Sequence, residues 1–186
     1  MNSLIKKNLL LVFLSVTMIA HVKAQFKKGD DVVVSFQSSV YYGSQTNDLS
    51  VQLSTDFNGK SDFESLKSAK WEDITSLFTY SESKEITPSE EKSISKYVQE
   101  GKPLFIAFKY TGKASAKPSQ RMWIIKSLTA KKAGKKLKTS DVMFINNPEN
   151  GDNVGWEIWG QGNAFRFRSQ MTKQASESWA VLEIKP

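Results

Sequence analysis

The sequence of 186 residues contains no cysteine and a single histidine, His21. A chain without cysteine forms no disulfides. His21 lies in the first 24 residues, which we expect to be cleaved off, so the remaining chain has no histidine either. It therefore lacks the usual zinc, haem and iron–sulfur ligands. The remaining chain then excludes Ser-His-Asp and Cys-His catalysis, so only carboxylate, lysine or tyrosine chemistry is left.

Long hydrophobic runs are also scarce. The one such run, residues 9–20, follows two lysines and precedes small residues suited to cleavage after Ala24. Its roughly 12 residues are too few to span a bilayer, which takes about 20. We therefore predict a signal peptide over 1–24 and a single domain over 25–186. The protein is expected to be exported, periplasmic or extracellular, with no transmembrane span and no cysteine for a lipid anchor.

The excess of positive charge is mild. The chain has 26 basic and 19 acidic residues, and removing residues 1–24 takes away three lysines and no acid, which leaves about +4. Five of the lysines lie between residues 131 and 138, without the interleaved aromatic side chains that stack on bases. We expect a solvated loop there and no nucleic-acid partner, while contact with an anionic polysaccharide stays open.

What the chain does have is a series of short β-branched and aromatic segments separated by turn residues. The near-continuous apolarity of 103–110 predicts a strand buried on both faces, with 121–128 as its neighbour. An irregular segment and a strand through Trp71 are expected over 61–75, and a polar connection over 129–138. Together these features predict an all-β sandwich with little helix. The remaining expected strands are 31–37, 49–54, 142–145, 155–159, 164–169 and 179–184.

Several segments, taken in order, resemble those of a known family. They are residues 49–59, 69–75, 102–110 and 121–125, with 177–182 as a closing strand. This combination resembles exported domains of unknown function related to choice-of-anchor J domains. The resemblance implies a galactose-binding-like jelly roll. It also implies a carbohydrate-binding or surface-accessory role, since such domains are commonly associated with polysaccharide-utilisation proteins. Lys126 stands where related chains often carry an acid.

One segment suggests a ligand-binding surface. Residues 164–168, Ala-Phe-Arg-Phe-Arg, alternate so that both phenylalanines lie on one side of a strand and both arginines on the other. An aromatic plane stacks on a sugar ring while guanidinium and amide groups bond its hydroxyls. Tyr41 and Tyr42 offer a further aromatic platform, although packing explains them equally well. The alternative, core tryptophans and solvated arginines, stays open. The candidates on this surface are Trp159, Gln161, Asn163, Arg166 and Arg168.

Oxygen-bearing side chains gather in two turns. Asp56, Asn58 and Asp62 form one group and residues 149–153 the other. Such oxygens suit Ca²⁺, but neither group has the spacing or final glutamate of an EF-hand. Asx turns explain both groups without a metal. We expect no cofactor and keep a structural Ca²⁺ as the alternative.

These features favour a secreted, non-catalytic module that binds a carbohydrate or another cell-surface ligand. One alternative is a structural envelope protein that contacts another exported protein. A glycoside hydrolase is the other alternative, with Glu72, Asp73 and Glu157 available. That chemistry needs two carboxylates about 5–10 Å apart across the scissile bond. Trp71, Trp123 and Trp179 lie in apolar segments and are expected in the core.

Overall fold

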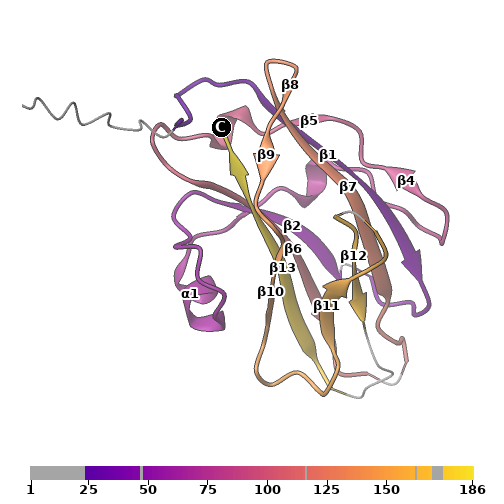
Figure 1. The fold of residues 1–186 in the computed structure, drawn as a ribbon. Coiled ribbons are helices and arrows are strands. Elements are labelled where there is room, and N and C mark those ends of the chain that lie inside the picture. Colours follow the sequence, from indigo (N-terminus) through magenta and orange to yellow (C-terminus); the bar gives the residue numbers. More distant parts are fainter. Residues whose placement is uncertain (1–23, 47, 116, 162, 169–173) are drawn as a thin grey trace, which may run out of the picture.

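The structure is a computed structural model that describes residues 24–186 apart from 47, 116, 162 and 169–173. The expected signal peptide over 1–24 lies outside this part except for Ala24. No helix among the described residues is long and apolar enough to cross a membrane. Two antiparallel sheets pack against each other, which confirms the predicted all-β sandwich (Figure 1).

Each sheet is built around long central strands. Sheet A runs in the order β11 (Gly155–Ile158), β12 (Phe165–Arg168), β7 (Met122–Lys132), β1 (Val32–Tyr41), β4 (Thr87–Pro88), with β5 (Lys92–Ser93) on β1 and β8 (Lys135–Lys136) on β7. Sheet B runs in the order β10 (Met143–Asn146), β13 (Ser176–Lys185), β6 (Leu104–Gly112), β2 (Leu49–Ser54), β3 (Glu72–Asp73), with β9 (Lys138–Thr139) on β13. The helical elements are α1 (Phe63–Ser68) and two 3₁₀ turns, η1 (Thr75–Leu77) and η2 (Ser95–Tyr97).

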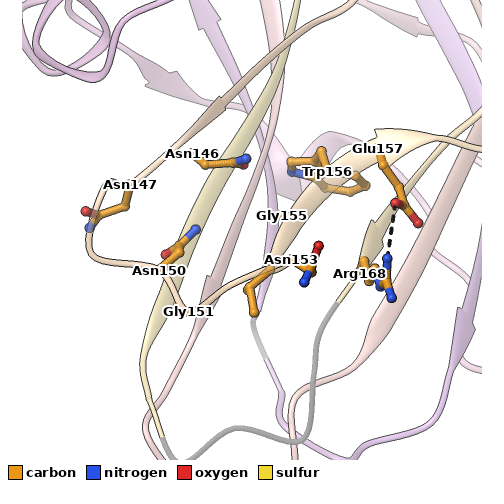
Figure 2. Close-up of a pocket in the computed structure, with 10 residues that line it drawn as sticks. Asn146, Asn147, Asn150, Gly151, Asn153, Gly155, Trp156, Glu157 and Arg168 are labelled. Atoms are coloured by element: carbon orange, nitrogen blue, oxygen red, sulfur yellow. Dashed lines mark ion pairs between the residues drawn. The ribbon is translucent and has the colours of Figure 1, made fainter.

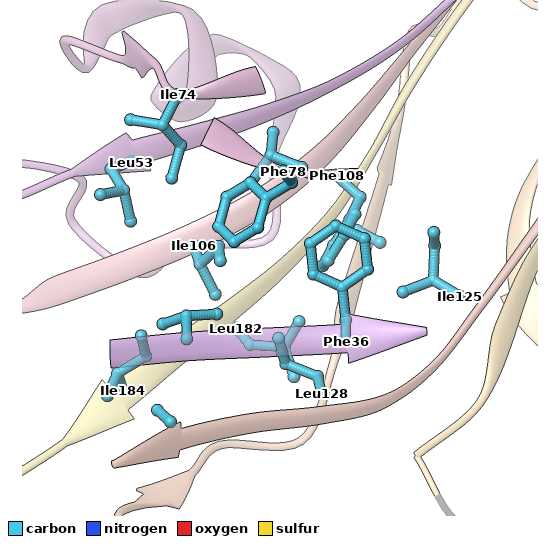
Figure 3. Packing of buried hydrophobic residues seen from close by; sticks show 14 of the residues in the cluster. Phe36, Leu53, Ile74, Phe78, Ile106, Phe108, Ile125, Leu128, Leu182 and Ile184 are labelled. Atoms are coloured by element: carbon cyan, nitrogen blue, oxygen red, sulfur yellow. The ribbon is translucent and has the colours of Figure 1, made fainter. Parts of the chain in front are cut away.

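The main core lies between the sheets (Figure 3). In β1, the alternation of β-branched and polar residues sends Val34 and Phe36 inward. The Phe36 ring meets Phe108 of β6 edge to face, with centroids 5.0 Å apart. Trp123 of β7 is also buried in this core, as predicted.

The outer face of sheet B is covered as well. Leu66 of α1 and the preceding Phe57 pack on Phe105 and Trp179, so both faces of β6 are buried as predicted. The helix α1 lies beside sheet B in Figure 1. The irregular segment expected over 61–75 is wrong: the Asp62 side chain accepts from the Ser65 N–H at 2.7 Å and caps a helix. Trp71 packs against this second cluster and lies just before the two-residue strand β3.

Two further expectations are wrong. Residues 121–128 are not neighbours of β6, because β7 belongs to sheet A and pairs with β1 and β12. The polar connection expected over 129–138 is a hairpin of β7 and β8. Its turn residues, Ala133 and Gly134, have φ values of +46° and +77°, as a tight turn with two left-handed residues requires.

Candidate functional site

The outer face of sheet A carries a continuous row of side chains. Ser39 of β1 pairs with Ile124 of β7, Ile124 pairs with Arg166 of β12, and Arg166 pairs with Glu157 of β11. Residues two apart on a strand share a face. Trp159 and Arg168 therefore lie on this face too. We call Glu157, Trp159, Arg166 and Arg168 the Trp–Arg face.

Arg166 is held between an aromatic ring and a carboxylate. Its Cζ lies 3.7 Å from the centroid of the Trp159 ring, and its Nε donates to Glu157 Oε1 at 2.6 Å. The Trp159 N–H donates to the Ala164 carbonyl at 2.9 Å, which fixes the end of the β11–β12 hairpin. Trp159 still has 42% of its surface exposed. The Arg166 guanidinium therefore packs against one side of the Trp159 ring, and the exposed remainder of the ring is open to a ligand.

Arg168 has a different position. Its Nη1 lies 3.9 Å from Glu157 Oε2, too far for a hydrogen bond, and its side chain is 49% exposed. Arg168 lines a pocket of about 300 Å³ between β11 and residues 147–154, shown in Figure 2. Glu157 lines the same pocket, so the pocket adjoins the Trp–Arg face. Its volume is at the lower end for small-ligand sites, which span about 300–1,000 Å³.

Four asparagines line this pocket, and we call it the asparagine pocket (Figure 2). Both amide atoms of Asn150 bond the backbone of Glu177 on β13, at 2.9 Å each. The Asn146 Oδ1 accepts from the Ser178 hydroxyl. The Asn147 Oδ1 accepts from the Glu149 N–H of its own turn at 2.9 Å. The fourth, Asn153, is exposed and has a φ of +58°.

The pocket depends on close packing at Gly155. This residue has a φ of +149°, and a Cβ on it would overlap the Asn146 amide. Because the position has no side chain, the Asn146 amide can lie against β11 and reach Ser178. Trp156, the next residue, is buried and donates its indole N–H to the Ser178 carbonyl at 3.1 Å. Trp156 is thus part of the core, while Trp159 is on the surface.

The remaining predicted ligand residues are placed less closely together. Tyr41 ends β1 and pairs with Met122, on the same outer face as Ser39. Tyr42 is 81% exposed, with its ring 6.2 Å from that of Tyr41. Gln161 is exposed in the β11–β12 turn. Asn163 lines a different pocket, beside the β7–β8 hairpin.

The predicted calcium candidates accept hydrogen bonds from backbone N–H groups near α1. The Asp56 Oδ1 accepts from the Lys70 N–H at 2.9 Å, and the Asn58 Oδ1 accepts from the Lys60 N–H at 2.9 Å. The Ser65 N–H donates to Asp62 and lowers the pKa of that carboxyl. Among the described residues, no three Asp, Glu, His or Cys side chains are grouped so that they could hold an ion.

The carboxylates considered for hydrolysis lie at opposite edges of the sandwich. Glu72 and Asp73 form β3, the last strand of sheet B, whereas Glu157 is on β11, the first strand of sheet A. The edge strand of sheet B that contacts β11 is β10, at the other end from β3. Glu157 therefore forms no catalytic pair with either residue across a single glycosidic bond.

Sequence reasoning missed most of the asparagine pocket. The sequence groups only residues 149–153, as oxygen-bearing side chains in a turn, and offers Glu157 only as a hydrolytic acid. The spacing of Glu157 and Trp159 was the available signal, since residues two apart share a strand face. Nothing local indicates that Asn146 and Asn150 are anchored to β13, because their partners are about 30 residues away.

Comparison with known proteins identifies a family. The profile of a family described as "Domain of unknown function (DUF5017)" matches residues 20–149. No curated protein and no solved structure matches the chain. The matched range ends before Asn150, so the Trp–Arg face and half of the asparagines lie beyond it.

Proposed function

Because the chain belongs to the DUF5017 family, whose description assigns no activity, we propose its function from its geometry: a non-catalytic module that binds carbohydrate on the Trp–Arg face and in the asparagine pocket. The observation that carries this proposal is an exposed Trp159 ring on a face that continues, through Glu157 and Arg168, into an amide-lined pocket. Such a ring stacks on the C–H face of a pyranose. The amides and Arg168 then bond hydroxyls of another sugar of the same glycan.

A comparison of the outer faces of the two sheets favours the Trp–Arg face as the binding surface. On sheet B, α1 and Phe57 pack over Phe105 and Trp179 and cover much of the outer face. On sheet A, Tyr41 extends the aromatic character of the face toward β1. A glycan chain lying across the strands would then meet Trp159 and Tyr41 with the arginines between them.

The proposal includes export and an association with polysaccharide use. Residues 1–24 have the charge and hydrophobic pattern of a signal peptide. The resemblance of four chain segments to exported domains related to choice-of-anchor J domains supports a galactose-binding-like jelly roll and a role beside polysaccharide-utilisation proteins. Both points rest on sequence pattern.

The test is binding of the purified chain to a panel of soluble polysaccharides by affinity electrophoresis, followed by calorimetric titration of the retained ones. Trp159→Ala should weaken binding about tenfold, since ring stacking contributes ~1 kcal/mol or more. Ile86→Ala, which also removes an exposed apolar side chain, should bind as the wild type does.

The urea midpoints of both variants should stay close to that of the wild type, which separates lost binding from unfolding. Retention of no polysaccharide would overturn the proposal, as would equal binding by the Trp159→Ala variant. Co-purification of a stoichiometric protein partner, without any glycan binding, would favour the alternative of a structural envelope protein.

A further inference from the structure

The Trp–Arg face carries one more positive than negative side chain. Two arginines share the single carboxylate of Glu157, and Arg166 takes it with a 2.6 Å hydrogen bond. Arg168 is left 3.9 Å from the same carboxylate. Among the described residues, Glu157 is the only acidic side chain that lines the asparagine pocket. An exposed guanidinium thus faces a pocket whose remaining polar side chains are neutral amides.

The hydrogen-bonding groups that the pocket's asparagine side chains leave unpaired are mainly donors. The Asn147 oxygen is occupied by the Glu149 N–H, and the Asn146 oxygen by the Ser178 hydroxyl. Within the described part of the chain, the NH₂ groups of these two side chains have no hydrogen-bond partner. An amide NH₂ donates and cannot accept. The pocket consequently offers mainly donors to a ligand.

A pocket that combines free N–H donors with a guanidinium suits an acceptor-rich anion. Carboxylate and sulfate oxygens accept several hydrogen bonds at once, and a guanidinium binds them through two parallel N–H groups. A neutral sugar hydroxyl accepts at most two hydrogen bonds and must also place its own hydrogen, for which the amide NH₂ groups offer no acceptor. The pocket is therefore better matched to a charged substituent than to a hydroxyl.

We propose that the asparagine pocket selects anionic glycans: Arg168, with the Asn146 amide in the same pocket, holds a carboxylate or sulfate group of a glycan, another sugar of which stacks on Trp159. This inference rests on the proposed carbohydrate binding and names its ligand class. Glu157 has a positioning role, because it orients Arg166 against the ring and holds Arg168 only by a 3.9 Å ion pair, which an anionic ligand can replace.

The test uses pairs of probes that differ only in charge. Oligogalacturonate is compared with its methyl ester, and a sulfated galactan with its desulfated form, by calorimetric titration at 50 and 500 mM NaCl. The anionic member of at least one pair should bind ten times more tightly than its neutral form at low salt. High salt should reduce that preference, since the contact is partly exposed. The pair that shows the preference identifies the anion as carboxylate or sulfate.

Variants test whether Arg168 is the source of the preference for anionic probes. Arg168→Gln should abolish the difference between the charged and neutral probes, while Arg168→Lys should retain part of it. Lys185→Gln removes one exposed positive charge elsewhere, on β13, and should leave the preference unchanged. An equal loss in Lys185→Gln would mean a general charge effect and would overturn the inference.

Two negative outcomes are distinguishable. If neutral and anionic probes bind equally and Trp159→Ala weakens both, the charge selection is wrong and the proposed carbohydrate binding stands. If no member of either pair binds and the wider polysaccharide panel also fails, both proposals fall together.

Discussion

Trp123 donates its indole N–H to the Asp48 carboxylate at 3.0 Å, and this bond joins the two sheets at one end of the sandwich. Trp123 belongs to β7 of sheet A, while Asp48 immediately precedes β2 of sheet B. Asp48 is only 3% exposed, and its Oδ2 has no hydrogen-bond partner among the described residues. Beside it, the Tyr110 hydroxyl of β6 accepts from the Arg121 N–H at 3.1 Å.

Removing the Trp123 donor should destabilise the protein more than removing a donor to a neutral group. Trp123→Phe leaves a buried carboxylate without that bond, and bonds to charged groups contribute about 1.5–3 kcal/mol. Trp156→Phe removes a ring of the same size and a bond to the Ser178 carbonyl, for which about 1 kcal/mol is expected. Urea unfolding of both variants measures the difference, and equal losses would contradict it.

The Asp48 carboxylate should make stability fall with rising pH. Burial raises its pKa above the ordinary 3.8, against the opposing effect of the Trp123 hydrogen bond. The folded state then holds the proton more tightly than the unfolded state, so this group's contribution is lost as the pH rises from 3.8 through the raised value. Asp48→Asn should therefore gain stability relative to wild type between pH 4 and pH 7. A pH-independent difference would count against this.

Asp62 should show the opposite sign. The Ser65 N–H lowers its pKa below 3.8, so its contribution is present above that value and is lost as the pH falls through the lowered one. Asp62→Ala should destabilise the protein at pH 7 and have a smaller effect at pH 2. Asp62→Ser keeps a side-chain acceptor for the helix cap and serves as the control. Equal unfolding midpoints for the two variants at pH 7 would refute the capping role.

Gly155→Ala should damage the asparagine pocket and the stability together. The new Cβ would displace the Asn146 amide, which costs its bond to Ser178 as well as backbone strain at a φ of +149°. Gly134→Ala has open space around it and carries only the strain of its positive φ, about 1–2 kcal/mol. Urea titration should show the larger loss for Gly155→Ala, and the reverse order would be contrary to the packing described.

The arrangement within each strand could be predicted from the sequence, because strand alternation is local. Phe165 and Phe167 are buried and Arg166 and Arg168 face outward, as predicted. Which strands pair could not be predicted, since pairing depends on contacts between distant residues. The assignment of 121–128 beside β6 failed for this reason. A strand with apolar residues suits either sheet of a sandwich equally well.

In the candidate site, too, the sequence predicts what depends on neighbouring residues and not what depends on distant contacts. The Trp–Arg face follows from two short neighbouring strands, and its arginines were found. The asparagine pocket needs Ser178 and the backbone of Glu177 on β13 to orient Asn146 and Asn150, and no local pattern carries that information. Tyr41 joins the same face only through the register of β1 with β7.

The position of β13 has a consequence for how the chain acquires its structure. This last strand is central in sheet B, where it pairs with β6, β10 and β9. Sheet B cannot be completed until residues 176–185 have been synthesised. Until then β6 and β10 each lack the strand that pairs with them in the folded sheet. Folding of sheet B must then follow synthesis of residues 176–185 and depends on long-range pairing, which makes it intrinsically slow. A polypeptide shortened at its C-terminus would expose the backbone of β6 and invite aggregation.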